Sequence, residues 1–252
     1  MEGKSEEAKD KKHKISSFIP KKKESAVDVV ISNVKRLLQS KEIRPGERLP
    51  NETELSQSLA VSRTAVREAM KIFSAFGIVE IRQGDGTYVS TSPNKVLLDP
   101  LFFSFILAEP DIKELVELRE LMEIEVIKLV VKNAGQSDIE LLKLAYLDLQ
   151  NKIDSNVKDS KILAQCDLNF HNVLASSTKN KLVEKIYNFT VDFFAPSIEK
   201  THENQSRGIA AMKSHKKILE AIIDRDMDKA VSAVRNSVVV WEKLLSSNID
   251  ER

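Results

Sequence analysis

Asp167 and His171 are the pair of residues in this chain whose types and spacing most directly indicate chemistry. They are four positions apart, so on a helix both side chains would project from the same face. A carboxylate and an imidazole held together in this way can bind a divalent metal ion. A metal-dependent hydrolase would use the same pair, but it also needs a positioned general base. No HExxH motif or second acidic cluster accompanies the pair in the sequence.

Arg119 is the candidate for recognising an anion. It falls in a long segment with helical periodicity, and a guanidinium inside a helical bundle requires a partner. A carboxylate matches the planar fork of arginine through two parallel hydrogen bonds. The alternative is an internal ion pair with Glu123, which follows four residues later on the same predicted helix.

The segment that must position these residues has the periodicity of helices. After Leu101, apolar residues recur at helical spacing, without an alternating strand pattern. Helices are expected near residues 111–134, 137–153, 160–176, 181–200, 207–224 and 226–246. Ser137 and Glu140 are expected to form a capping box for the second of these, and Pro196 to kink or break the fourth. The pattern predicts an antiparallel bundle of six or seven helices within residues 101–252.

A helix-turn-helix is indicated further upstream, between residues 46 and 76. Asn51 can cap a short helix, and Glu54, three residues on, can complete a capping box. A turn of small residues follows, and Ser62 can cap a second helix over about residues 63–76. The first turn of that helix presents Ser62, Arg63, Thr64 and Arg67 outward. Such a helix end suits the major groove of double-stranded DNA, where arginine can bind guanine and hydroxyl groups can reach phosphates or base edges.

A hairpin and one more helix complete this unit. Gly77 can end the second helix, and residues 78–82 and 87–90 alternate as short strands around a turn at 83–86, which predicts a wing. Apolar spacing over residues 27–38 predicts the third helix of the core. The fold class is therefore mainly α: a winged helix-turn-helix domain at 24–90, a proline-bounded linker at 91–100, and the bundle.

Composition adds limits on location and on the N-terminus. The chain has 252 residues, a net charge of +1 and one cysteine, Cys166, which excludes an internal disulfide. No signal peptide or apolar run of membrane-spanning length is found, so a cytoplasmic protein is expected. Residues 1–23 carry eight lysines against four acidic residues, and this tail is expected to be disordered. Its lysines either add salt-sensitive attraction to DNA phosphates or only increase solubility.

The segment over residues 46–89 resembles the GntR family of bacterial transcription regulators. The matching residues are Leu-Pro-x-Glu-x-x-Leu at 49–55, Val-Ser-Arg-Thr-x-Val-Arg-Glu-Ala at 61–69, Gly-Ile-Val at 77–79 and Gly-x-Gly-Thr-Tyr-Val at 84–89. The resemblance implies that Arg63, Arg67 and the wing glycine Gly84 contact the operator. Thr53 departs from the family pattern, which commonly has arginine there, so one operator or phosphate contact would be absent or altered.

The bundle is similar to the FCD effector domain of the FadR-type GntR regulators, which is all-helical. The matching residues are more diffuse, namely Glu117-Leu118-Arg119 with Glu123, residues 167–171, Ser214-His215 and Asp226. Many members use this aspartate and histidine with two further histidines to bind a divalent ion that holds a carboxylate effector. The resemblance implies that Asp167, His171 and His215 bind Zn²⁺ or a similar ion. The fourth ligand is expected at position 237, where this chain has Ser237, a poor ligand at neutral pH.

Two interpretations of this altered site stay open. Three ligands with open positions suffice for a zinc ion that also binds water or an anion. Alternatively, His171 and His215 are buried polar residues that bind an organic ligand directly. In both cases Arg119 and Ser237 are expected to belong to the effector-binding site.

The expected function is a homodimeric transcription regulator, most often a repressor in this family, and not an enzyme. Two-fold symmetry would pair two recognition helices on a short palindromic operator. A small carboxylate in the bundle would shift the population between dimer forms that fit and misfit the DNA. The alternatives are a metal-dependent hydrolase with a DNA-targeting domain and a DNA-architectural protein without a ligand. The architectural protein would leave a bundle of about 150 residues unexplained.

Overall fold

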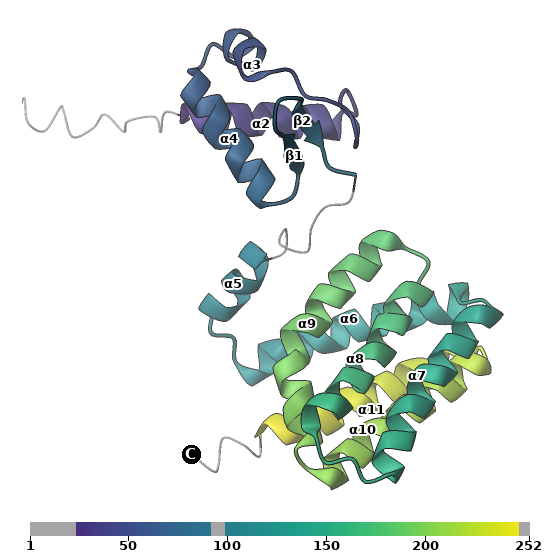
Figure 1. Cartoon of the computed structure of the whole chain (residues 1–252). Helices are drawn as coiled ribbons and strands as arrows, with labels where there is room; N and C mark the ends of the chain where they lie inside the picture. Colours follow the sequence, from purple (N-terminus) through teal and green to yellow (C-terminus); the bar gives the residue numbers. More distant parts are fainter. Residues whose placement is uncertain (1–23, 92–98, 247–252) are drawn as a thin grey trace, which may run out of the picture. The chain divides into compact units, whose positions relative to one another are not determined.

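The computed structural model describes residues 24–91 and 99–246, which fall into two compact units over residues 1–99 and 100–252 (Figure 1). The predicted tail at 1–23 and most of the predicted linker at 91–100 lie outside the described residues. None of the described helices is long and apolar enough to cross a membrane.

The N-terminal unit is the predicted winged helix-turn-helix. It consists of α2 (Ala26–Gln39), α3 (Glu52–Ser58), α4 (Arg63–Ala75) and an antiparallel hairpin of β1 (Val79–Arg82) and β2 (Gly86–Val89). Its core is formed by apolar residues from all three helices and both strands, including Val30, Leu55, Val66, Phe73 and Val89. The wing is therefore anchored to the same core that holds the helix-turn-helix.

The predicted caps of this unit are confirmed. The Asn51 side chain accepts hydrogen bonds from the backbone N–H groups of Thr53 and Glu54, and the Glu54 carboxylate accepts one from Asn51 N–H at 2.8 Å. Ser62 Oγ accepts a hydrogen bond from Ala65 N–H at 3.1 Å. These caps satisfy amides that the helix itself leaves unpaired, and so fix where α3 and α4 begin.

The C-terminal unit is the predicted helical bundle. Its described helices are α5 (Asp99–Leu107), α6 (Ile112–Asn133), α7 (Gln136–Asp154), α8 (Ser160–Ser177), α9 (Lys181–His202), α10 (Gln205–Ile223) and α11 (Met227–Ser246). α8 packs between α7 and α9, while α11 packs against α6 and α10. Their shared core contains Val130, Leu142, Phe170 and Ile222, all of which are fully buried. This packing brings α8, α9 and α10 together around the polar site.

One local prediction for the bundle is wrong, and of the two alternatives predicted at Pro196, a kink or a break, the break is excluded. Ser137 and Glu140 do not cap α7, because the helix begins two residues earlier: Asp138 accepts a hydrogen bond from Gly135 N–H at 2.8 Å, and its own N–H donates to the Gly135 carbonyl at 3.1 Å. Pro196 does not break α9, which continues to His202. Proline removes one backbone donor, but α9 is held on both sides of Pro196 by buried Phe194 and Ile198 in one apolar cluster.

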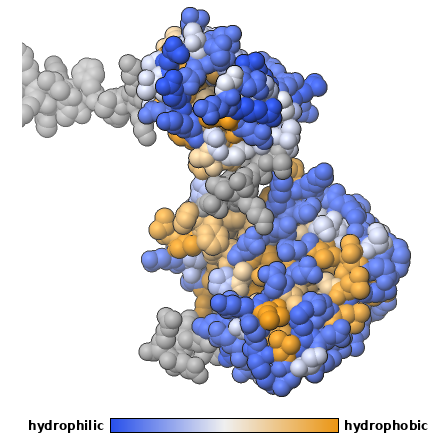
Figure 2. Space-filling model, viewed as in Figure 1, coloured by the Kyte–Doolittle hydropathy of each residue, from blue (hydrophilic) through white to orange (hydrophobic). Residues whose placement is uncertain are grey.

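Apolar side chains remain on the surface of the bundle. Figure 2 shows hydrophobic residues gathered over α5 and over α7. α5 packs on α9 through edge-to-face contacts of Phe102 and Phe105 with Phe189 and Phe193. The residues that stay more than half exposed include Phe103 and Leu107 on α5, Leu141 and Leu144 on α7, and Leu182 and Ile186 on α9.

Candidate metal site and nucleic-acid interface

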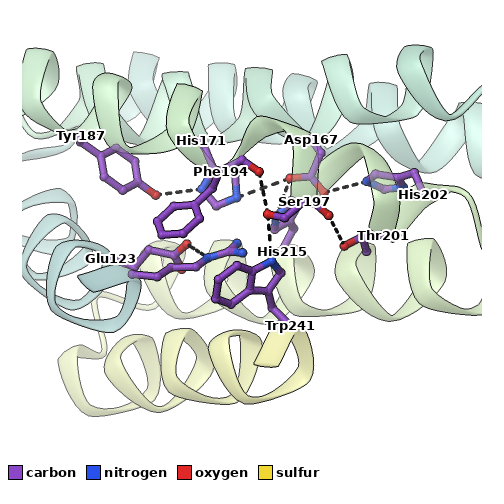
Figure 3. Close-up of polar contacts among 11 residues, drawn as sticks. Glu123, Asp167, His171, Tyr187, Phe194, Ser197, Thr201, His202, His215 and Trp241 are labelled. Carbon is purple, nitrogen blue, oxygen red and sulfur yellow. Dashed lines mark hydrogen bonds and ion pairs between the residues drawn. The ribbon is translucent and has the colours of Figure 1, made fainter. Parts of the chain in front are cut away.

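Asp167, His171 and His215 form a buried cluster inside the bundle (Figure 3). Asp167 and His171 lie one turn apart on α8, as their spacing predicted, and His215 comes from α10. Asp167 Oδ1 is 3.4 Å from His171 Nε2 and 3.6 Å from His215 Nε2. One ligand atom from each of the three residues lies within 4.8 Å of the others. The cluster therefore has the residue types and the spacing that could hold a metal ion.

His202 is a fourth buried residue at this cluster, and the sequence analysis did not identify it. Its Nε2 atom is 2.9 Å from the second carboxylate oxygen of Asp167, Oδ2. The sequence prediction ended the helix near residue 200 and allowed a break at Pro196, which left His202 without a position. A helix extended past Pro196 would have placed this histidine in its last turn, and that was the only signal for it in the sequence.

Tyr187 supports the cluster from α9. Its hydroxyl lies 2.8 Å from His171 Nδ1, the ring nitrogen that does not face Asp167. Complete burial raises the pKa of Tyr187 well above its ordinary value, so its side chain is a neutral phenol that can accept or donate a hydrogen bond. A partner on Nδ1 fixes the orientation of the His171 ring and leaves Nε2 toward the cluster.

The electrostatics of the cluster give the protonation states that a metal ion requires. Burial acts to raise the pKa of Asp167, but the nearby His215 and His171 rings and the hydrogen bond from His202 outweigh it, and the pKa is well below its ordinary value. Burial lowers the pKa of His215 to about 4. At neutral pH the site thus offers an ionised carboxylate and a neutral imidazole.

An unsatisfied atom in the cluster also fits an ion. His171 Nε2 is buried and has no hydrogen-bond partner among the described residues. An unpaired polar atom in a protein interior is unfavourable unless something else occupies its lone pair. The donor set of one carboxylate and imidazole nitrogens is typical of zinc and similar divalent ions.

Arg119 lies on α6 and forms the internal ion pair with Glu123 that the sequence offered as one of two alternatives. Its Nε–H donates to Glu123 Oε1 at 2.8 Å, and both side chains are buried. Its Nη1 atom, however, has no partner among the described residues. The guanidinium carbon lies 4.5 Å from the centre of the Trp241 ring. The internal ion pair with Glu123 therefore exists, and one edge of the guanidinium is still available to an anion.

A small cavity of about 30 Å³ joins these groups. Its lining includes Arg119, Asp167, His215, Ser237 and Trp241. Ser237 thus lies beside the same cavity as two residues of the cluster, at the position where a fourth histidine was expected.

The predicted DNA-contacting residues are exposed at the start of α4 and in the wing. Ser62, Arg63, Thr64 and Arg67 are all exposed at or near the first turns of α4. Gly84 has a φ of +77°, and no atom lies within 4 Å of the place where a side chain would begin. This backbone favours glycine and leaves the tip of the wing open to close approach.

Arg67 has an ion-pair partner that the sequence analysis did not foresee. Its Nε and Nη2 atoms donate to the two carboxylate oxygens of Glu52 at 3.1 and 2.8 Å. Glu52 opens α3, so this pair connects the two helices of the helix-turn-helix. The hydrogen bond from Arg67 lowers the pKa of Glu52, which stays ionised at neutral pH.

A winged helix-turn-helix followed by a helical bundle with a buried polar site defines the class of ligand-responsive DNA-binding regulators. Comparison with known families agrees with this class. Residues 26–89 match the family described as bacterial regulatory proteins, gntR family, and residues 114–239 match the FCD domain. The chain belongs to the GntR family of transcription regulators and carries an FCD effector domain.

The chain is similar to known transcription regulators over most of its own length and of theirs. HTH-type transcriptional regulator LutR of Bacillus subtilis (strain 168) is 26% identical over 220 residues, covering 85% of this chain and 99% of that protein. The Uxu operon transcriptional regulator of Escherichia coli (strain K12) is 28% identical over 222 residues, covering 82% of each chain. The solved structure of Streptococcus agalactiae GntR matches with a TM-score of 0.59 at 24% identity, covering 86% of this chain and 99% of that one, which supports the fold.

Proposed function

We propose that this regulator is a homodimeric repressor whose operator binding responds to a small carboxylate in the bundle. The observation that carries the proposal is the unpaired Nη1 of Arg119, which belongs to a residue lining the same cavity as Asp167 and His215. A buried guanidinium edge without a partner is unfavourable, and a carboxylate would satisfy it.

The second part of the proposal is a divalent ion, such as Zn²⁺, held by Asp167, His171 and His215. When bound, the ion would supply a positive centre for an anionic effector. Ser237 contributes no imidazole, so positions on the ion would stay open toward the cavity that Arg119 also lines. The effector carboxylate would then be bound from two sides, by the ion and by the guanidinium.

The DNA-binding part of the proposal assigns operator contacts to Ser62, Arg63, Thr64, Arg67 and Gly84. Arg63 and Thr64 lie in the first turn of α4 and are exposed, as direct contact with bases or phosphates requires. Arg67 is held against Glu52 through two of its nitrogens, which restricts the directions that its guanidinium can take. Two copies related by a two-fold axis would read a short palindrome.

The homodimer is supported by an apolar face on α9. Leu182, Ile186, Phe189 and Phe193 follow one another at spacings of four, three and four residues, so they share one face of the helix. α5 covers Phe189 and Phe193, whereas Leu182 and Ile186 remain exposed. An exposed apolar face that continues a covered one is typical of a surface buried by a partner.

Light scattering at several protein concentrations tests this surface. A variant with Leu182→Glu and Ile186→Glu should be monomeric, because two charges would have to be buried in the interface. The matched control is Leu141→Glu with Leu144→Glu, which places the same charges on exposed leucines of α7. A dimer that persists in the α9 variant and dissociates in the α7 variant would assign the interface to α7.

Selection of bound fragments from genomic DNA tests the regulatory function itself. Zinc-loaded protein should enrich a small set of fragments that share a short palindrome, and genes next to them would indicate the metabolite. Competition with small mono-, di- and tricarboxylic acids then tests release. Equal recovery of all fragments, in proportion to their length, would contradict the proposal and favour an architectural protein.

A further inference from the structure

His202 is buried against Asp167 but is not one of the three proposed metal ligands. Its side chain has no exposed surface, and it comes from the end of α9. We infer that His202 is a positioning residue for the metal site. It fixes the Asp167 carboxylate so that Oδ1 faces His171 and His215. This inference rests on the proposed metal site and adds a residue to it.

The geometry separates the two oxygens of Asp167. Oδ1 faces the Nε2 atoms of His171 and His215 at 3.4 and 3.6 Å, which are too long for good hydrogen bonds. Oδ2 faces His202 Nε2 at 2.9 Å, which is an ordinary hydrogen-bond length. The Oδ2 atom of a carboxylate accepts, so His202 Nε2–H is the donor. One oxygen is therefore held by hydrogen bonding, and the other is left for an ion.

This arrangement matters more in a site with three ligands than in one with four. Ser237 stands where a fourth histidine was expected. With one protein ligand fewer to hold the ion, binding depends more on a correctly oriented Asp167 carboxylate. Loss of a hydrogen bond to a metal-ligating side chain typically lowers metal affinity roughly 10- to 100-fold. His202 makes such a bond to Asp167, as Tyr187 does to His171.

The position of His202 is itself determined by close packing. A side chain added at Gly208, on α10, would place its Cβ 2.9 Å from His202 Nδ1, which is too close. His202 and Gly208 also line a cavity of about 110 Å³, with Ile153 and Leu163 among its walls. The absence of a side chain at Gly208 thus leaves room for the ring, and the cavity gives a displaced ring a place to move.

Three variants test the inference by zinc affinity, measured in competition with a chelator, and by the absorption spectrum of bound Co²⁺. His202→Ala should bind zinc roughly 10- to 100-fold more weakly. His202→Gln should recover part of that loss, since its amide nitrogen can donate to Oδ2. Gly208→Ala should weaken binding by displacing the ring, with every donor atom of the site still present.

The control is Ser177→Ala on α8, which removes a buried hydroxyl that donates to the backbone carbonyl of Val173 on the same helix. It should leave zinc affinity and the Co²⁺ spectrum unchanged. Circular dichroism of each metal-free variant reports folding, and Gly208→Ala decides the question if His202→Ala does not fold. Wild-type affinity in both His202→Ala and Gly208→Ala would overturn the inference and leave the metal site standing. A wild-type protein that binds no zinc would overturn both.

Discussion

Arg67 in the DNA-binding unit and Arg119 in the bundle each pair with a glutamate, but in very different surroundings. The side chains of Arg67 and Glu52 are 57% and 34% exposed, whereas those of Arg119 and Glu123 are 8% and 7% exposed. An exposed ion pair contributes little to stability, so its arginine can exchange a carboxylate for DNA at small cost. A buried arginine nitrogen without a partner cannot be satisfied by bulk water, so a bound ligand is its natural partner.

The same contrast holds for the polar residues around these two arginines. At the start of α4, the hydroxyl and guanidinium groups are exposed. In the bundle, one carboxylate contacts three histidines, and all four side chains are buried. The first arrangement fits a large partner that brings its own charges. The second fits a small ion and a ligand that enter the protein.

Removal of a histidine should have the largest effect on the buried site. His171→Ala should abolish zinc binding, because it deletes one of three ligands, while Ser237→His should tighten binding by supplying a fourth. Metal content after dialysis against graded concentrations of a chelator measures both changes. If the wild type keeps no zinc and Ser237→His acquires it, His171 and His215 would be reassigned to direct binding of the effector. If neither protein binds zinc, the ligand assignment taken from the family is wrong.

Burial of His215 should make the stability of the metal-free protein depend on pH. Burial lowers its pKa from 6.5 to about 4, so the unfolded chain takes up this proton at a higher pH than the folded protein. The free energy of unfolding should therefore fall as the pH drops through this interval, by roughly 3 kcal/mol in total. Urea unfolding in the presence of a chelator measures this dependence. His215→Gln should flatten it, and equal profiles for the two proteins would refute the explanation.

Loss of Arg67 tests the exposed side of the comparison. Arg67→Ala should reduce the preference for operator over random DNA by about 1 to 3 kcal/mol if the side chain contacts a base. Competition binding with the two DNAs measures the ratio. Arg36→Ala is the matched control, since Arg36 has similar exposure and also pairs with a glutamate, but lies outside α4. An unchanged ratio for Arg67→Ala would restrict Arg67 to phosphate contact or to none.

Deletion of residues 1–23 should have the smallest effect. The lysines of this segment are expected to contact phosphates without reading bases, so nonspecific affinity should fall and its dependence on salt should become less steep. Preference for the operator should stay the same. Titrations at several salt concentrations compare the two proteins, and equal slopes would leave the tail with a solubilising role only.

The features that could be predicted from sequence are those set by residues close together in the chain. The caps at Asn51 and Ser62 depend on neighbours within three residues, so they predicted where α3 and α4 begin. Asp167 and His171 are one turn apart on one helix, and their juxtaposition followed from helical geometry.

Contacts between distant segments were not predictable in the same way. His202 reaches Asp167 across 35 residues, and Glu52 reaches Arg67 across 15. Both depend on how helices pack, which a periodic pattern does not specify. The continuation of α9 past Pro196 has the same origin, because local preference favoured a break and packing of the apolar cluster outweighed it.

The central claim is that the buried site in the bundle controls operator binding, and operator affinity measured with and without carboxylates tests it most directly. Zinc-loaded wild type and His171→Ala are titrated with labelled operator in the presence of the same panel of small carboxylic acids. At least one acid should weaken operator binding by the wild type and have no effect on the variant. A variant that releases the operator at the same acid concentration as the wild type would contradict the account.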